Sequence, residues 1–339
     1  MKFTFAEPQR AHNPAMFLSA GARKPNPEVP ERIQRLLTGA NDAGLAMIAA
    51  QDHGLAPVSA VHSPEYLEFL QVIYGQWQTI SGASDEVIPN IHPNRRDFSY
   101  PTSPVGRAGY HMADTACPIA ADTWNSAYWS AQTAIEAAKL VQNGEPAAYA
   151  LCRPPGHHAY ADMAGGFCFL NNSAIAAQVL RESHDRVVVL DVDLHHGNGT
   201  QGIFYHRADV MTVSIHVDPA VFYPFFWGHA SERGEGAGLG YNYNLPLARG
   251  SGNQEFLDAL DLALDRIRAY RPGALVLALG LDASEHDPFG GFTVNEQGFT
   301  SIAQKCASLK LPTVIVQEGG YICDQLGGNL TYFLRGFGG

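Results

Sequence analysis

Five short segments of the chain are almost continuously apolar, and longer segments with helical periodicity lie between them or before them. Apolar runs of this kind are typical of strands that are buried on both faces of a parallel sheet. We predict these strands at residues 147–152, 186–193, 209–216, 274–282 and 312–317. We predict helices at residues 30–43, 64–79, 123–142, 171–182, 254–270 and 296–309. The alternation predicts an α/β fold with a mostly parallel central sheet and helices on both of its faces.

Two long segments, 82–117 and 218–240, show neither pattern. The first is rich in Pro, Asn, Ser and Asp, and the second mixes aromatic residues with glycines. Loops of this length in a compact enzyme commonly form the walls of a functional site or contacts between subunits. Because we find no repeat and no linker, residues 1–339 are predicted to form one catalytic domain that carries a long loop insertion at about 82–117.

The composition argues against several classes of protein. The formal net charge is −11, with only 22 Lys and Arg residues and no basic run, so nucleic acid is not expected as a partner. No run of about 18 apolar residues is present, so no membrane span is expected. The five cysteines lack CxxC spacing, which argues against a disulfide framework or a thiolate zinc site. Without a basic and apolar leader segment, the expected location is cytoplasmic.

One of the predicted strands becomes polar at its carboxyl end, with residues that have the chemistry of metal ligands. Asp191, Asp193 and His195 alternate with Val192 and Leu194. Because the side chains of a strand alternate between its two faces, the three polar residues are expected on one side. They also lie at the carboxyl end of the strand, where open α/β sheets hold their sites. Buried carboxylates are costly without a cation, so the pattern predicts a metal site.

A second predicted strand ends in Asp282, which can supply a further ligand from a neighbouring strand. Two carboxylates and one histidine, from Asp193, His195 and Asp282, leave a coordination position open for water or substrate. That arrangement is typical of catalytic rather than structural zinc, although iron or cobalt would suit the same ligands. Asp287 precedes Pro288 and is interpreted as a turn residue or as a support for the ligands.

Two more strands lead into candidate catalytic residues. His157 and His158 follow a Pro-Pro-Gly turn, and we predict that they act as general base and general acid toward water. Gly319 and Gly320 follow the last predicted strand and let the backbone turn sharply. This turn would bring the hydroxyl of Tyr321 to a developing oxyanion.

Together these motifs resemble those of the histone deacetylase and acetylpolyamine amidohydrolase superfamily. The resemblance extends from Pro27 to the C-terminus and rests on the ordered segments RPPGHHA, GGFCFLNN, DVDLHHGNGT, SIHVDP, GLDASEHDP and EGGY. The bacterial acetylpolyamine amidohydrolases look like the most similar branch, because of the chain length, these motifs and the long 82–117 segment. The resemblance implies the arginase/deacetylase fold and a zinc-dependent hydrolase that cleaves the linear amide of a small N-acyl amine.

The resemblance also implies roles for individual residues. One zinc ion would bind Asp193, His195 and Asp282. His157, oriented by Asp191, would share the proton transfers with His158, and Tyr321 would donate to the oxyanion. Asn198 stands where many histone deacetylases have Asp, so His158 lacks a charged partner, as it does in the acetylpolyamine branch.

One or two structural potassium ions are implied by the same resemblance. The first would be held by Asp191, Ser214 and Ile215, together with backbone carbonyl groups of Asp193 and His195. The second would be held by carbonyl groups near Phe204, Arg207 and Val210, with Tyr241 close by. A homodimer or homotetramer is implied as well, in which the 82–117 segment crosses onto a partner subunit and narrows its active site.

Phe167 and Tyr223 match the aromatic walls of the substrate tunnel in this superfamily, and we place Gly166 and Gly319 beside them. Such walls admit a narrow, extended methylene chain and exclude water from the scissile amide.

The chain departs from the acetylpolyamine branch at the tunnel entrance. That branch places acidic residues there, which receive the distal ammonium groups of the substrate. At those places this chain has Phe17, Val105 and Ala116, with Asp114 and Glu318 as partial substitutes. The entrance is therefore expected to be more apolar than a dedicated polyamine pocket.

Several functions remain open at this point. Deacylation of a small N-acyl amine, such as an acetylpolyamine or acetylated diamine, is the leading hypothesis. Phe17 and Val105 favour a second one, hydrolysis of a neutral or xenobiotic amide. A deacetylase of acyl-lysine in proteins is the third. A two-manganese ureohydrolase would need further Asp and His ligands, and a binding module without catalysis would not need the complete set of catalytic residues.

Overall fold

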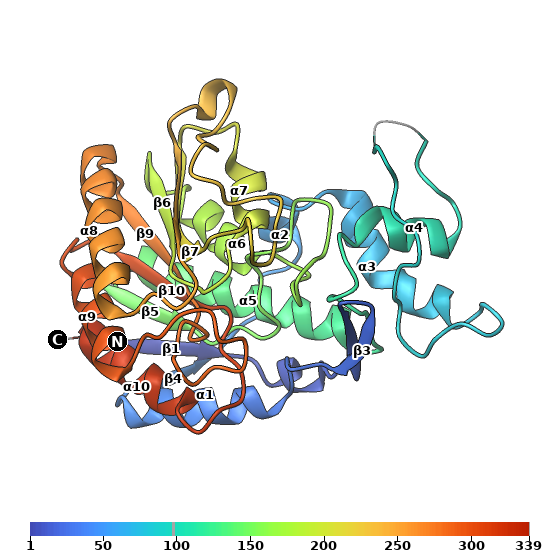
Figure 1. The fold of residues 1–339 in the computed structure, drawn as a ribbon, viewed down its shortest axis with the longest axis horizontal. Coiled ribbons are helices and arrows are strands. Elements are labelled where there is room, and N and C mark those ends of the chain that lie inside the picture. The colour runs from blue at the N-terminus through green and yellow to red at the C-terminus, as the bar shows by residue number, and fades with distance from the viewer. Residues whose placement is uncertain (97–98, 339) are drawn as a thin grey trace.

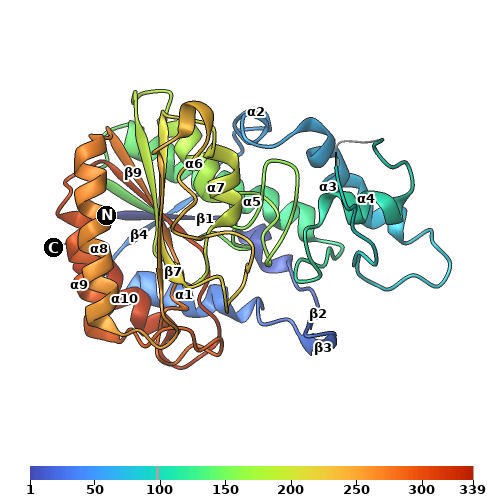
Figure 2. The same cartoon turned by 45° about the horizontal axis from the view of Figure 1, so that its top comes forward.

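The computed structural model describes residues 1–96 and 99–338 (Figure 1). Its centre is one eight-stranded sheet in which every neighbouring pair of strands is parallel. From edge to edge the strands are β4 (Ala46–Ala49), β1 (Lys2–Phe5), β5 (Ala147–Ala150), β10 (Thr313–Gln317), β9 (Ala274–Leu279), β6 (Val187–Asp191), β7 (Val210–Val217) and β8 (Asn242–Leu247). A separate antiparallel hairpin, β2 (Met16–Ser19) and β3 (Ala22–Pro25), lies beyond the end of α1 (Figure 2).

The five predicted strands are confirmed and form the continuous centre of the sheet, from β5 to β7. The sequence does not predict β1, β4 and β8, for different reasons. β1 and β4 have only four residues each, and β4 lies at the edge with mostly exposed residues. In β8, Asn242 and Asn244 interrupt the apolar run.

Helices cover both faces of the sheet, as predicted (Figures 1 and 2). On one face lie α5 (Thr123–Gln142) and α6 (Asn172–Leu180), which pack with Val187 and Val189 of β6. On the other face lie α1 (Glu31–Asp42), α8 (Asn253–Tyr270), α9 (Glu296–Ala307) and α10 (Leu326–Gly338), which pack with Val188 and Leu190. Val187 to Leu190 of β6 thus enter two different apolar cores in turn, which explains why the strand is apolar up to Asp191.

The C-terminal helix α10 was not predicted, because glycines interrupt its apolar pattern. One of them is needed where α10 crosses α1. A Cβ atom on Gly327 of α10 would lie 2.8 Å from the carbonyl oxygen of Arg35, and one on Gly39 of α1 would lie 2.4 Å from the carbonyl oxygen of Gly327. The two helices therefore approach each other closely through glycine, and the close packing compensates for the low helix propensity of this residue.

A lobe lies beside the sheet, at the right of Figure 1. It contains α3 (Pro64–Trp77), α4 (Pro104–His111) and the segments that join them, and it is preceded by α2 (Ala56–Ser59). The prediction that 82–117 is entirely a loop is wrong for α4. Ser103 caps this helix, because its Oγ accepts the N–H of Gly106 at 3.1 Å. With only eight residues and two glycines, α4 is too short to show a clear period. Nowhere in the described ranges is a helix long and apolar enough to cross a membrane.

Four neighbouring strands bring the candidate site residues to one edge of the sheet. The histidine pair follows β5, Tyr321 follows β10, Asp282 follows β9, and Asp193 follows β6. These strands are adjacent in the order β5-β10-β9-β6 and all run in the same direction. Because the carboxyl ends of parallel strands meet at one edge, the four loops converge there.

Candidate active site

Two carboxylates and one imidazole lie together beyond β6 and β9. One ligand atom from each of Asp193, His195 and Asp282 lies within 4.8 Å of the other two, and all three side chains are buried. Nδ1 of His195 is 3.3 Å from Oδ1 of Asp193 and 3.1 Å from Oδ2 of Asp282. The donor set and its spacing fit a catalytic zinc ion, which these three side chains would hold.

Two glycines make room for the carboxylates. A Cβ atom on Gly280 would lie 2.1 Å from Oδ2 of Asp193, and one on Gly319 would lie 2.3 Å from Oδ2 of Asp282. Gly319 also donates its N–H to Oδ2 of Asp193 at 2.8 Å. Gly319 therefore lies directly against Asp193 and Asp282 of the candidate metal-binding group (Asp193, His195 and Asp282), and any side chain at this position would displace the two carboxylates.

The electrostatics of this group favour a cation. Burial lowers the pKa of His195, but hydrogen bonds to Asp193 and Asp282 raise it to about 9. Burial raises the pKa of Asp193, but the positive charge of His157 and the contacts with His195 hold it below its usual range. Burial and the charge of Asp193 raise the pKa of Asp282. A divalent cation would stabilise the charged form of both carboxylates.

The predicted alternation of side chains is confirmed, although β6 itself ends at Asp191. Val192 and Leu194 pack into the apolar core, away from the metal-binding group. Oδ1 of Asp191 accepts the N–H of Asp193 at 3.0 Å, and its Oδ2 lies 2.9 Å from Nδ1 of His157. Asp191 therefore connects the ligand segment with the histidine pair.

The rings of His157 and His158 lie side by side, with centroids 4.0 Å apart. Oδ1 of Asn198 lies 2.6 Å from Nδ1 of His158, and its amide group donates to the hydroxyl of Tyr160 at 3.2 Å. With the amide oxygen of Asn198 facing this ring, Nδ1 of His158 is the donor of the contact, and Nε2 keeps a free lone pair.

The two histidines differ in charge. Burial would lower the pKa of His157, but the carboxylates of Asp193 and Asp191 raise it to about 10. Burial and the positive charges of His157 and His195 lower the pKa of His158 well below its usual value. One imidazole is therefore cationic and its neighbour neutral, which is the pairing that acid–base chemistry requires.

Tyr321 follows a sharp turn at Gly320, whose φ of +108° favours glycine. Oδ2 of Asp287 accepts the N–H of Tyr321 at 2.9 Å, and the guanidinium of Arg32 lies 5.0 Å from the centre of its ring. Burial raises the pKa of the Tyr321 hydroxyl well above its usual value, so the hydroxyl keeps its proton and can donate it to an oxyanion.

Two aromatic residues beside His195 were missed by the sequence analysis. The rings of Phe222 and Phe289 each lie 5.3 Å from the His195 ring, on different loops. Phe289 also contacts Tyr321 at 4.8 Å, so it joins the metal-binding group to the tyrosine. The position of Phe289, seven residues after a ligand and two after Asp287, is the one signal that could have indicated it.

The suggestion that Glu318 substitutes for an acidic entrance residue is wrong. Its side chain is fully buried, and burial raises its pKa to about 7. Its Oε2 accepts the N–H groups of Gly156 at 2.6 Å and His157 at 3.0 Å, and its Oε1 accepts the hydroxyl of Ser173 at 2.7 Å. Glu318 therefore supports the loop that carries His157 and His158 and is not available to a substrate.

The predicted tunnel walls lie next to the catalytic groups. The ring of Tyr223 is 4.9 Å from that of His158, and the ring of Phe167 is 5.8 Å from that of Tyr321. Phe17, from β2, packs edge-on against Phe167 at 5.5 Å and extends this apolar wall. Its place at the tunnel entrance stays a prediction.

The other predicted entrance residues have different environments. Val105 lies on α4, where its side chain packs against the apolar core of the lobe side. Ala116 is half-buried and donates its N–H to Oδ1 of Asp114 at 2.8 Å. Asp114 in turn accepts the hydroxyl of Tyr223 at 2.7 Å. Of the two proposed acidic substitutes, only Asp114 contacts a tunnel wall.

The predicted potassium ligands are partly brought together. Asp191 and Ser214 are paired neighbours on β6 and β7, and Ile215 follows Ser214 directly. Oγ of Ser214 lies 2.8 Å from Nδ1 of His216. For the second site, Phe204, Arg207, Val210 and Tyr241 lie around the end of α7 (Asn198–Phe204) and the start of β7. Both potassium sites stay predictions.

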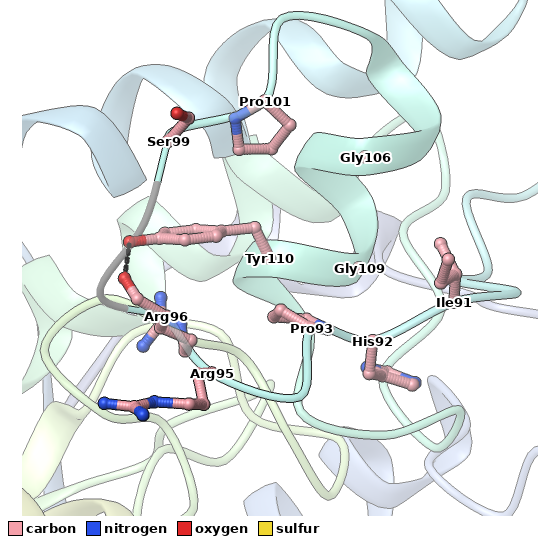
Figure 3. Close-up of a pocket in the computed structure, with 10 residues that line it drawn as sticks. All are labelled: Ile91, His92, Pro93, Arg95, Arg96, Ser99, Pro101, Gly106, Gly109 and Tyr110. Atoms are coloured by element: carbon pink, nitrogen blue, oxygen red, sulfur yellow. Dashed lines mark hydrogen bonds between the residues drawn. The ribbon is translucent and has the colours of Figure 1, made fainter.

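A surface pocket of about 210 Å³ lies on the lobe, apart from these residues (Figure 3). The guanidinium of Arg96 lies 4.2 Å from the centre of the Tyr110 ring in this pocket and is paired with Asp162 at 2.9 Å. The pocket contains none of the predicted site residues. Its lining residues are Ile91, His92, Pro93, Arg95, Arg96, Ser99, Pro101, Gly106, Gly109 and Tyr110.

A buried histidine behind the site leads to a prediction about pH. Nε2 of His62 accepts the N–H of Asn171 at 2.9 Å, so His62 must be neutral there, and burial lowers its pKa to about 4. Between pH 7 and pH 5 the unfolded chain therefore binds a proton that the folded chain does not. We expect this group to lower the free energy of unfolding by about 2 kcal/mol over that range.

Urea unfolding of the wild type and of a His62→Gln variant at both pH values measures this effect. The contribution of neutral His62 to the free energy of unfolding should be fully present above the ordinary histidine pKa and should fall as the pH decreases toward 4. The variant should lose less stability than the wild type, since glutamine does not titrate. An identical loss in the two proteins would contradict the assignment of the neutral state to His62.

The chain matches the family model described as the histone deacetylase domain over residues 26–337. It is 48% identical to the acetylpolyamine amidohydrolase of Burkholderia pseudomallei (strain 1710b) over 335 residues, which cover 98% of each chain. It is 44% identical to acetylpolyamine amidohydrolase 1 of Pseudomonas aeruginosa, over 100% of this chain and 99% of the relative.

The solved structures include a close match in fold. The crystal structure of acetylpolyamine aminohydrolase from Burkholderia pseudomallei superposes with a TM-score of 0.97 at 47% identity and covers 100% of this chain and 98% of that chain. The predicted deacetylase-type fold is thus confirmed along the whole chain. On the family match, the near-complete relatives and this shared fold, the chain belongs to the histone deacetylase family.

Proposed function

We propose that the chain is a zinc-dependent amidohydrolase that cleaves the amide of small N-acyl amines, with acetylpolyamines as the first candidates. The observation that carries the proposal is the convergence of the candidate metal ligands, a charged and a neutral histidine, and Tyr321, with the aromatic rings of Tyr223 and Phe289 beside them. The names of the relatives, which are acetylpolyamine amidohydrolases over nearly the full chain, support the choice of substrate.

The side chains of this site divide the reaction among them. Zinc held by Asp193, His195 and Asp282 would polarise the amide carbonyl and lower the pKa of the attacking water. His158 offers a free lone pair at Nε2, takes the proton from that water and returns it to the leaving amine. His157, kept cationic by Asp191, stabilises the negative charge that develops.

Tyr321 completes this arrangement from the opposite loop. Its protonated hydroxyl donates a hydrogen bond to the oxyanion as the carbonyl carbon becomes tetrahedral. Asp287 holds the backbone of Tyr321 by accepting its N–H. Arg32 lies over the tyrosine ring and holds the preceding residue, because its Nε donates to the carbonyl oxygen of Gly320 at 2.6 Å. A donor supported in this way would be in position before the reaction begins, which would keep the cost of reorganisation low.

A kinetic comparison tests the substrate. We expect kcat/KM for acetylputrescine and acetylspermidine to exceed that for an acetyl-lysine peptide by at least about tenfold. The reason is that the lobe around α3 and α4, together with the β2–β3 hairpin, would clash with a bulky peptide substrate. The physical basis is the β2–β3 hairpin, which meets the insertion where the N–H of Leu18 donates to the carbonyl oxygen of Thr115 at 3.4 Å. A clear preference for neutral anilides would overturn the polyamine assignment and favour the alternative of a neutral amide.

Three further predictions belong to this proposal. One or two potassium ions would stabilise the carboxyl end of β6 and β7, at Asp191 and Ser214 first, since these residues are neighbours. The 82–117 segment would take part in a homodimer or homotetramer. The enzyme would act in the cytoplasm on a small-molecule substrate.

A further inference from the structure

We propose that Asp114 sets the width of the substrate tunnel, by holding both aromatic walls with one carboxylate, and that it restricts substrates to amines with an unbranched chain next to the amide. This inference rests on the proposed function and adds the shape of the accepted amine to it. Asp114 lies in the insertion, 109 residues away in sequence from one wall and 52 from the turn that carries the other.

The first wall is held through its hydroxyl. Tyr223 donates to Oδ2 of Asp114 at 2.7 Å. The same ring contacts the catalytic side, because its centroid is 4.9 Å from the ring of His158 and 6.1 Å from that of His195. A hydrogen bond to a carboxylate is among the stronger ones available to a tyrosine, so it fixes the ring on that side of the tunnel.

The second wall is held through its backbone. The N–H of Gly166 points at the same carboxylate, 3.2 Å from Oδ2 and 3.4 Å from Oδ1. Gly166 and Phe167 both have positive φ values, +50° and +68°, so this turn is constrained and Phe167 is strained. A Cβ atom on Gly166 would lie 2.7 Å from the hydroxyl oxygen of Tyr223, so the turn and the tyrosine are in close contact.

Asp114 is itself fixed in place. Its Oδ1 accepts the N–H of Ala116 at 2.8 Å, which closes a local turn. The adjacent Ala113 donates its N–H to the carbonyl oxygen of Ala164 at 2.8 Å, so this part of the insertion lies along the segment that leads to Gly166. Asp114, which holds both aromatic walls, is thus itself tied to the segment that leads to Phe167.

These contacts decide what Asp114 can do for a substrate. Its oxygens already accept hydrogen bonds from two N–H groups and one hydroxyl. Binding of a distal ammonium group would have to compete with these contacts, so Asp114 is a positioning residue rather than a receptor for charge. A methylene chain is narrower than a ring or a branch, so we expect two rings held in this way to admit the chain and to have to separate for a ring or a branch.

Two neutral substrates show the effect of tunnel width without any effect of charge on the substrate. N-acetylbutylamine has a linear chain, and N-acetylcyclohexylamine carries a ring at the position that must pass the walls. The variants are Asp114→Ala, which removes the anchor, and Tyr223→Phe, which removes only the hydroxyl that Asp114 holds. We expect both variants to raise the ratio of kcat/KM for the cyclohexyl substrate over the butyl substrate by about tenfold or more.

Asp162→Ala is the matched control, because Asp162 is paired with Arg96 at 2.9 Å and its side chain is 38% exposed. The control should keep the wild-type ratio. If Asp114→Ala does not fold, the ratio of the two kcat/KM values in Tyr223→Phe still tests the proposal, because this variant keeps the aromatic ring and loses only the hydroxyl. Proportional changes in both rates would overturn the inference, because a merely structural support would affect the two substrates equally. A zinc-loaded wild type that is inactive on acetylputrescine as well as on both neutral amides would contradict the proposed function instead.

Discussion

The Tyr321→Phe variant is expected to turn over acetylputrescine about 100 to 1,000 times more slowly than the wild type, while it binds zinc normally. The reason is that the substitution removes one hydroxyl and leaves the ring in its place. The ring contacts Phe289 and Phe167, and Arg32 lies over it, so packing should be kept. What is lost is the donor that faces the oxyanion, which acts only as the transition state forms.

The effect should therefore appear in kcat, with little change in KM. The matched control is Tyr332→Phe, because Tyr332 lies on α10 with 38% of its surface exposed and should give wild-type turnover. Metal analysis of each protein separates loss of the donor from loss of zinc. Undiminished turnover in Tyr321→Phe would remove this residue from the mechanism.

The Asp282→Asn variant is expected to lose most of its zinc and to be at least about 1,000-fold less active, since metal ions contribute several kcal/mol to the stabilisation of the transition state. Asparagine keeps the shape of the side chain and can still accept the N–H of Leu194, which Oδ1 of Asp282 accepts at 3.0 Å. The fold should therefore persist, and the loss of the negative charge should weaken the binding of zinc.

Thermal unfolding supplies a second readout that does not depend on activity. Zinc at about 1,000 times its Kd should stabilise the wild type by about 4 kcal/mol and raise its Tm. The variant should show little of this rise. Asp324→Asn, at an exposed position, is the control and should behave as the wild type does. A wild-type rise of Tm in Asp282→Asn would exclude Asp282 as a ligand.

The centre of the fold could be predicted from sequence because its physical signal is local. Val187 to Leu190 of β6 each face one of two apolar cores, so the strand is apolar up to Asp191 at its carboxyl end. The polar residues that follow it keep the same alternation, which is why Asp191, Asp193 and His195 could be read as one face. Parallel strands then bring Asp282 and Tyr321 to the same edge.

The remaining parts depend on contacts that no local pattern contains. Gly327 of α10 allows close packing against α1, and the pattern alone does not show that neighbour. Glu318 looked like an entrance residue, yet the β10 turn buries it under the histidine loop. Asp114 and Tyr223 form a pair across 109 residues of sequence, so only the folded chain reveals their contact.

Titration of metal-free protein with zinc, while the hydrolysis of acetylputrescine is followed, tests the central claim most directly. The site formed by Asp193, His195 and Asp282 predicts that activity is absent without metal, rises in proportion to added zinc and levels off at one zinc ion per chain. Full activity without metal, or a requirement for two manganese ions per chain, would contradict it.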